Sequence, residues 1–265
     1  MMDSVIIGKY VPGHSLVHRM DPRSKLIMIF LFVFIVFLAN NLLTYVVLGL
    51  FTLFIVLLTR LPIHFLLNGL KPILWIILFT FILHLFVTKE GRILLDLGVF
   101  RIYEEGLKQG IFISLRFLYL ILITTILTLT TTPIEITDGM ESLLAPFKKI
   151  GLPVHELALM MSISLRFIPT LMEETDKILK AQMARGVDFA SGPIKARLKA
   201  VVPLLVPLFI GAFKRAEELA TAMEARGYKG GEGRTKLRQL HWRYLDTSVL
   251  SLLVVLGFVL FFLRT

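Results

Sequence analysis

Residues 26–58 read LIMIFLFVFIVFLANNLLTYVVLGLFTLFIVLL, two almost unbroken apolar runs joined by Asn40-Asn41. Each run, with its flanks, approaches the ~20 residues that an α-helix needs to cross the hydrocarbon core of a bilayer. The two asparagines leave room only for a tight turn between the runs. This stretch therefore predicts a helical hairpin within a membrane rather than part of a soluble core.

Further apolar runs follow at residues 73–87, 111–129 and 249–263. Hydrophobic residues make up 56% of the 265-residue chain, whereas soluble domains average about 45–50%. The chain has no cysteine, which excludes disulfides and thiolate metal sites. We therefore expect an all-α integral membrane protein with about five transmembrane helices, multi-pass in the cell membrane.

The distribution of Lys and Arg predicts the orientation of the chain in the membrane. The net charge is +10, and basic residues gather before the first apolar run, after the second, and between residues 133 and 246. Four spans place all three regions on one side, which the positive-inside rule identifies as the cytoplasm. Residues 88–109 then lie outside, where the alternating pattern at 93–103 predicts a small hairpin. Aromatic and basic residues are not interleaved in an exposed polar tract, so nucleic acid is not expected as a partner.

These features divide the chain into an N-terminal transmembrane domain of four helices over residues 1–132, a cytoplasmic domain over 133–245, and a C-terminal transmembrane helix over 246–265. The threonine-rich stretch at 124–132 predicts a bend from the fourth span into the cytoplasmic domain. Two long helices are expected there, from about Pro153 to Arg185 and from about Pro193 to Arg226. Each would be about 50 Å long at 1.5 Å per residue.

Both long helices are predicted to be amphipathic and to lie at or below the cytoplasmic surface, with apolar upper halves and solvated ends. Glu156 and Arg166 interrupt the apolar half of the first. The apolar part of the second, residues 200–213, is too short for a typical span. It contains Pro203 and Pro207, each of which removes a backbone donor. These prolines mark either a static kink or a compliant hinge that lets the apolar half adapt to a neighbour.

Both long helices end in the same pattern, Ala181-Gln-Met-Ala-Arg-Gly186 and Ala222-Met-Glu-Ala-Arg-Gly227. A single copy has a plain structural explanation, because a cation in the last turn complements the helix dipole and Gly accepts the left-handed conformation that ends a helix. Two copies on two similar helices favour recognition of a partner instead. The alanines permit close approach, and a guanidinium offers a planar set of donors to a carboxylate or a backbone carbonyl.

Polar residues elsewhere form no catalytic constellation. The six histidines have no metal-ligand spacing, and neither a Walker A pattern nor a nucleophile–base set is present. We therefore expect no metal site, no cofactor and no enzymatic activity in the chain itself, so that energy from ATP must come from a partner. Arg116 lies within the fourth apolar run, where it either snorkels towards the interface or pairs internally.

At the two repeated patterns the chain resembles the transmembrane T component of energy-coupling factor (ECF) transporters, whose members carry two Ala-Arg-Gly boxes at the ends of two coupling helices. Both boxes are complete here, as Ala184-Arg185-Gly186 and Ala225-Arg226-Gly227. The stretches at residues 130–139 and 22–25 also resemble that family. The similarity covers essentially the whole chain.

The resemblance implies a complex with two ATPase subunits and a small membrane-embedded substrate-binding (S) subunit, often specific for a vitamin or a metal ion. The chain would then be the energy-coupling scaffold of an importer, whose coupling domain docks on the ATPases and passes their motion to the S subunit. The two boxes have unequal surroundings, with Val187-Asp188 after one and Tyr228-Lys229 after the other, which indicates non-identical ATPases. The docking residues that the resemblance implies are Ala184, Arg185, Gly186, Ala225, Arg226 and Gly227.

The contact with the S subunit is expected on the apolar part of the last long helix, from its interfacial position alone. The residues concerned are Leu204, Leu205, Leu208 and Phe209.

Two other functions are kept as alternatives. A self-contained secondary transporter would need charges within its spans and paired broken helices, whereas these spans hold few charges. A membrane-bound enzyme that uses the basic cytoplasmic tract on a lipid would need a nucleophile or a metal set. Co-purification with a pair of ATPase subunits would separate the three readings.

Overall fold

The structure is a computed structural model that describes residues 10–96, 101–189, 193–231 and 238–264. In these ranges it contains eight α-helices, one 3₁₀ helix and one two-stranded hairpin, which confirms the expected all-α class. The chain divides into two compact units, a transmembrane unit of residues 7–142 and 239–265 and a paired-helix unit of residues 143–238. The first boundary falls near the end of α5 (Pro133–Leu144), later than the predicted boundary after residue 132.

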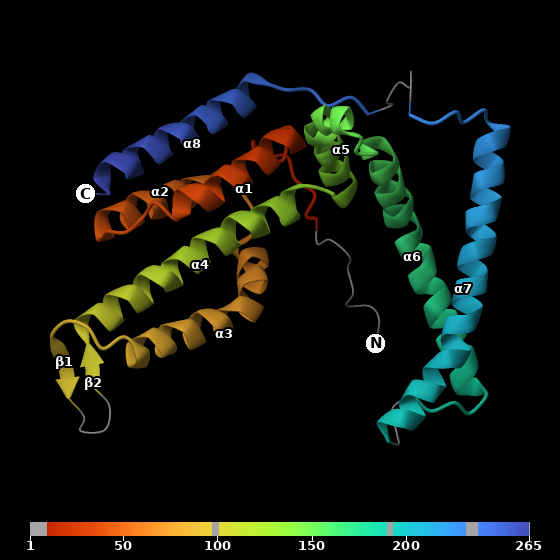
Figure 1. The fold of residues 1–265 in the computed structure, drawn as a ribbon, viewed down its shortest axis with the longest axis horizontal. Coiled ribbons are helices and arrows are strands. Elements are labelled where there is room, and N and C mark those ends of the chain that lie inside the picture. Colours follow the sequence, from red (N-terminus) through yellow and green to blue (C-terminus); the bar gives the residue numbers. More distant parts are fainter. Residues whose placement is uncertain (1–9, 97–100, 190–192, 232–237, 265) are drawn as a thin grey trace. The chain divides into compact units, whose positions relative to one another are not determined.

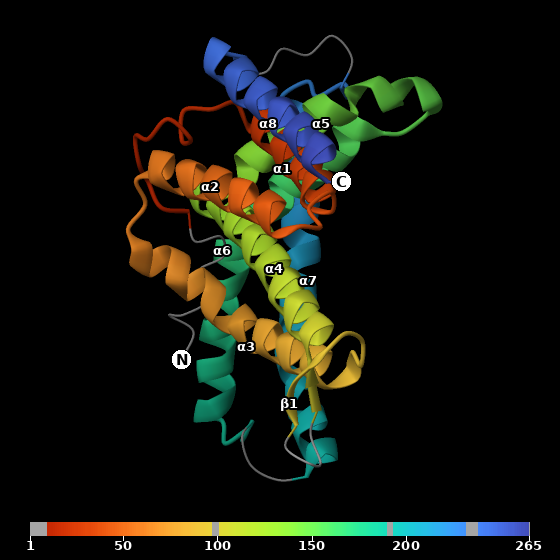
Figure 2. The ribbon, with the colours of Figure 1, turned by 90° about the vertical axis from the view of Figure 1, so that its left-hand side faces the viewer.

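The transmembrane unit is a bundle around one apolar core. Between its third and fourth helices, strands β1 (Ile93–Asp96) and β2 (Arg101–Tyr103) pair antiparallel, where the alternating pattern predicted a hairpin. The helix α3 (Ile63–Val87) packs along α4, beside which it lies in both views (Figures 1 and 2). The core is built mainly by α1 (Pro22–Val36), α2 (Leu42–Thr59), α4 (Glu104–Thr130) and α8 (Tyr244–Leu263), and α3 adds Leu66 to it.

The helix α3 bends part-way along its length (Figure 1). Pro72 lies inside it, and a proline within a helix both removes a backbone hydrogen bond and clashes with the preceding turn. The third apolar run of the sequence begins after this proline, at residues 73–87. The structure carries the helix back to Ile63, because a proline can bend a helix without ending it.

Within the described ranges, five helices are long and apolar enough to cross a membrane: α2, α3, α4, α6 (Val154–Ala184) and α8. The number agrees with the expectation, but the set differs from it. With 15 residues, α1 is only about 22 Å long, short of the ~30 Å hydrocarbon core. The most apolar window of α6 has a mean hydropathy of 1.2, against 2.1 to 2.5 in the other four, because Glu156 and Arg166 interrupt even its apolar half.

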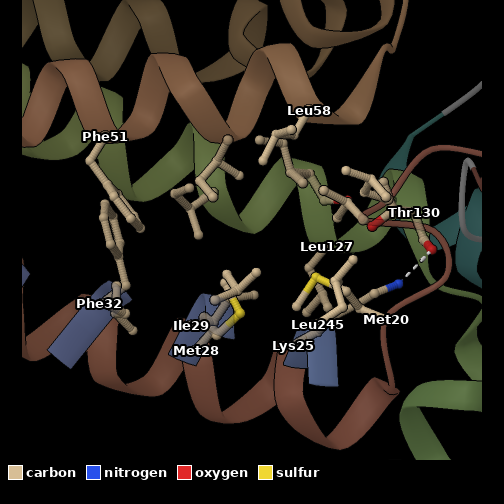
Figure 3. A pocket seen from close by; sticks show the side chains of 17 residues that line it. Met20, Lys25, Met28, Ile29, Phe32, Phe51, Leu58, Leu127, Thr130 and Leu245 are labelled. Atoms are coloured by element: carbon tan, nitrogen blue, oxygen red, sulfur yellow. Dashed lines mark hydrogen bonds between the residues drawn. The ribbon is translucent and has the colours of Figure 1, made fainter. Parts of the chain in front are cut away.

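The core of the transmembrane unit leaves a cavity of about 70 Å³ between α1, α2, α4 and α8 (Figure 3). The rings of Phe32 and Phe51 stack in its wall, with centroids 6.2 Å apart. Lys25 and Thr130 also contribute to the wall, and Lys25 Nζ donates a hydrogen bond to the Thr130 carbonyl at 3.0 Å (Figure 3). The remaining lining is apolar, so side chains that face the gap lack part of their van der Waals contacts.

A buried polar network joins the first helix to the last. Asp246 is fully buried and accepts hydrogen bonds from the Asp21 backbone N–H at 2.9 Å and from the Ser24 hydroxyl at 2.6 Å. Asp21 also caps α1 and pairs with Arg23 at 2.9 Å. Burial alone would raise the pKa of the Asp21 carboxyl, but the hydrogen bonds and charge of Arg23 hold that pKa below its ordinary value. Both ends of the chain sequence therefore contribute to one fold.

The sequence raises two questions about α4: whether the chain bends after it, and whether Arg116 pairs internally. The helix ends at Thr130, Thr131 is extended (φ −139°, ψ 129°) and α5 begins at Pro133, so the chain does bend after the threonine-rich stretch. Arg116 pairs internally rather than snorkelling. Its Nη2 donates to the Ala39 carbonyl at 3.2 Å and to the Tyr45 hydroxyl at 3.0 Å.

The paired-helix unit consists of the short 3₁₀ helix η1 (Ala145–Ile150) and the long helices α6 and α7 (Ile194–Ala225), close to the predicted bounds. The two long helices are antiparallel and diverge towards the end where α7 finishes (Figure 1). Gln182 Nε2 donates to the Pro203 carbonyl at 3.5 Å, and Glu174 forms an ion pair with Arg215. The first contact joins the C-terminal part of α6 to the N-terminal part of α7, and the second joins the central parts of the two helices.

Prolines interrupt neither long helix. Pro203 and Pro207 lie inside a continuous α7, and Pro169 lies inside α6 in the same way. Each proline leaves one carbonyl in the preceding turn without its usual donor. The choice between a static kink and a compliant hinge at Pro203 and Pro207 stays a prediction.

Candidate docking site at two helix ends

The end of α6 has a specific backbone geometry. Arg185 is the C-terminal cap, and Gly186 follows with φ +86°. The Gly186 N–H donates to the Met183 carbonyl and the Val187 N–H to the Gln182 carbonyl, both at 3.0 Å. This pair of bonds is the Schellman motif, which satisfies carbonyls at a helix end and requires a left-handed residue after the cap.

The end of α7 repeats this geometry. Arg226 is the cap and Gly227 has φ +72°. The Gly227 N–H donates to the Glu224 carbonyl at 2.9 Å, and the Tyr228 N–H donates to the Met223 carbonyl at 3.0 Å. The two sequence copies therefore form the same local structure, with the arginine at the same position of the same motif.

The arginines at these ends are exposed and unengaged. Every residue of both boxes is exposed, and within the described residues neither Arg185 nor Arg226 forms a side-chain hydrogen bond or an ion pair. A Cβ added to Gly186 or Gly227 would meet nothing within 4 Å, so the glycines are required by their positive φ and not by crowding within the chain. Each guanidinium can thus present its donors to an acceptor without breaking a hydrogen bond or an ion pair.

The antiparallel packing sets the two boxes far apart. Glu174 lies opposite Gly211 and Arg215, and residues around Ile163 lie opposite Leu219 and Met223. Continued along both helices, this register places Arg226 beside residue 160 of α6, about 25 residues from Arg185. At 1.5 Å per residue, the two guanidinium ends are therefore about 40 Å apart, at opposite ends of the helix pair.

The residues expected to contact an S subunit divide between two sides of α7. Leu205 and Phe209 are 42% and 60% exposed, whereas Leu204 and Leu208 are half-buried. By helical spacing, the half-buried pair lies on the side of α7 that carries Gly211 and Arg215, which face α6.

The exposed side of α7 continues well beyond the two residues predicted for it. Its residues recur at intervals of three and four from residue 202 onwards. This spacing in the sequence is typical of one apolar face of a helix. The apolar ridge of α7 consists of Val202, Leu205, Val206, Phe209, Ile210 and Phe213, all exposed.

Comparison with known proteins places the chain among transporter components. The family described as "CbiQ: Cobalt transport protein" matches residues 13–237. The chain belongs to the CbiQ family. A Bacillus subtilis relative, called "Energy-coupling factor transporter transmembrane protein EcfT", is 75% identical over 264 residues and 100% of both chains. Proteins of the same name from Exiguobacterium sibiricum and Listeria innocua are 58% and 57% identical, over 98% and 100% of this chain and 99% and 100% of theirs.

Membership of the CbiQ family agrees with the resemblance seen in the boxes and with the apolar helices of the fold. The chain is accordingly a transmembrane component of a transporter. In the part of the chain that the structure describes, no three His, Asp or Glu side chains gather as metal ligands. The geometry offers instead two exposed cationic helix ends and one apolar ridge, which are surfaces for partners.

Proposed function

We propose that this chain is the energy-coupling scaffold of an ECF-type importer, in which it links ATP hydrolysis by two cytoplasmic ATPase subunits to movement of a membrane S subunit. The observation that carries the proposal is the pair of matched, unengaged guanidinium ends on α6 and α7. The same geometry built twice is expected where a protein meets two related partners.

The separation of the two ends supports one ATPase at each. Helix ends about 40 Å apart can each contact a different domain, but they cannot form one binding site together. Arg185 and Arg226 would donate to carboxylates or carbonyls of the ATPases, while Ala184 and Ala225 keep the contact close. The different residues after the boxes support non-identical ATPases.

The apolar ridge of α7 is the surface on this chain for the S subunit. Leu205 and Phe209 lie at its centre, and Phe213 is 74% exposed at its end. The ridge and the Arg226 box belong to one continuous helix, so a force on the box reaches the ridge through an unbroken backbone. Pro203 and Pro207 would let the first half of α7 follow the S subunit.

The excess of Lys and Arg between residues 133 and 246 supports a cytoplasmic position for the paired-helix unit in the cell membrane. The transported substrate would be a vitamin or another micronutrient, bound by the S subunit and not by this chain.

Reversal of both box charges tests the proposal. We expect the double variant Arg185→Glu, Arg226→Glu to insert and fold but to lose ATPase co-purification and uptake. A buried charged contact that is broken in an interface costs about 2–5 kcal/mol. Each single variant should weaken the association.

The matched control is the double variant Lys177→Glu, Lys214→Glu, which reverses one exposed charge on each helix outside the boxes. It should keep both ATPases and uptake. The proposal fails if the Arg185→Glu, Arg226→Glu chain still co-purifies with two ATPases and transports.

A further inference from the structure

A pocket of about 640 Å³ lies where α6 and α7 diverge, at the Arg226 end of the pair. The first half of α6 forms one wall, and the last turns of α7 form the other. The segment after α7 then crosses towards α6, where Gly231 lies against the ring of His155. The pocket is as large as typical small-ligand sites, which measure about 300–1,000 Å³.

The lining combines an apolar floor with cationic groups. Leu159, Ile163, Phe167, Leu219 and Met223 supply the floor. The charged and hydroxyl groups of the lining are Arg166, Arg226, Lys229, Ser162 and Tyr228.

The described residues of this lining carry only positive charge. Among them, three cations and no carboxylate line the pocket. Within the described residues, neither Arg166, Arg226 nor Lys229 has a side-chain hydrogen bond or an ion pair. Cations gathered in a cleft with low-dielectric walls raise the local potential and attract an anion. The apolar floor adds a requirement for non-polar side chains beside that anion.

We infer that Arg166 and Lys229 complete, with Arg226, a three-cation pocket that receives an apolar, carboxylate-bearing segment of the ATPase subunit at the α7 end. The inference rests on the proposed function, because that function already brings an ATPase to Arg226, and the pocket is continuous with that arginine. A partner that covers Arg226 also covers the pocket, and a peptide with an acidic side chain between apolar ones matches both its floor and its cations.

The pocket also makes the two docking ends chemically different. The boxes correspond at an offset of 41 residues, from Arg185 to Arg226, so the α7 counterpart of Arg166 is Pro207. At the aligned position, α7 therefore carries no charge that corresponds to Arg166. An ATPase suited to the α7 end needs a protruding acidic segment, which gives these ends a means of choosing between two non-identical ATPases.

The chain has no native cysteine, so each end can be monitored separately. Met183→Cys and Glu224→Cys occupy the same position in the two boxes and can carry a photo-crosslinker. In the full complex with both ATPases and the S subunit, we expect Arg166→Glu to lower crosslinking from position 224 at least about tenfold, in line with a broken interface ion pair. Crosslinking from position 183 should be unchanged.

Milder variants separate docking from folding. Arg166→Gln should lower crosslinking from position 224 by a smaller factor, and Arg166→Lys, which keeps the charge, should restore most of it. Lys177→Glu, an exposed charge reversal elsewhere on α6, should change neither position.

Three results would overturn the inference. In the first, Arg226→Glu abolishes crosslinking from position 224 while Arg166→Glu and Lys229→Glu do not, which leaves the proposed function intact. In the second, Arg166→Gln lowers crosslinking from both positions equally, which identifies Arg166 as a structural residue. In the third, crosslinking is unaffected and Arg166→Glu instead weakens binding to phosphatidylglycerol vesicles, which identifies a lipid headgroup as the occupant.

Discussion

At the scale of the residue, each box combines a glycine that the helix end requires with an arginine that it does not require. Gly186 and Gly227 must adopt positive φ to close the Schellman motif, which explains the glycine without any partner. The exposed arginine before each glycine forms no side-chain hydrogen bond or ion pair in the described structure, which the motif does not explain. The glycine thus fixes the direction in which the chain leaves, and the arginine remains available.

Substitution of these glycines should weaken docking without a change of charge. We expect Gly227→Ala to place alanine in a left-handed conformation at a penalty of about 1–2 kcal/mol, and so to lower the affinity of the ATPase at the α7 end at least about fivefold. Titration of purified ATPase against the chain in nanodiscs measures the change.

The matched control is Gly211→Ala in the same helix, where the nearest atom to an added Cβ is Glu174 Oε2 at 3.8 Å and φ is ordinary. It should leave ATPase affinity unchanged, since alanine is favourable in a helix interior. Equal affinities for the Gly227→Ala and parental chains would show that the motif geometry is not needed for docking.

At the scale of the element, the sequence predicts helix bounds better than helix partners. The caps and prolines place α6 and α7 within a residue or two, because those signals are local. Their antiparallel pairing depends on contacts such as Glu174 with Arg215, which no local pattern encodes. For this reason the sequence alone groups Leu204 and Leu208 with Leu205 and Phe209, although the helix turns the two pairs to different sides.

The cavity in the core of the transmembrane unit allows a test of how α8 packs against the other helices. Val249 of α8 lines the cavity of the transmembrane unit, so we expect Val249→Ile to fill part of it and to raise stability by up to about 0.8 kcal/mol, the value of one buried methylene. The thermal midpoint of the detergent-solubilised chain should rise.

Val255→Ile is the control for this substitution, because Val255 lies on the same helix and is 55% exposed. It adds the same methylene outside the cavity and should leave the midpoint unchanged. A midpoint that falls in Val249→Ile would mean that the cavity cannot accept the added group without strain.

At the scale of the whole molecule, the paired-helix unit is inserted in the chain between two parts of the transmembrane unit. The chain leaves the transmembrane unit after residue 142 and returns at residue 239, so two crossings of the chain connect the units. Arg23 forms hydrogen bonds next to both crossings, within the transmembrane unit. Its Nη1 donates to the Ser142 hydroxyl at 3.4 Å and its Nη2 to the Leu240 carbonyl at 3.3 Å.

This position of Arg23 predicts a defect in coupling rather than in assembly. Arg23→Lys keeps a charge for Asp21 but loses the guanidinium fork that reaches Ser142 and Leu240 together. We expect both ATPases to bind normally, while uptake per ATP hydrolysed falls about tenfold, since a lost hydrogen bond from a charged donor costs about 1.5 kcal/mol. Arg19→Lys, at an exposed arginine, should leave that ratio intact. An unchanged ratio in Arg23→Lys proteoliposomes would show that the two crossings transmit motion without this arginine.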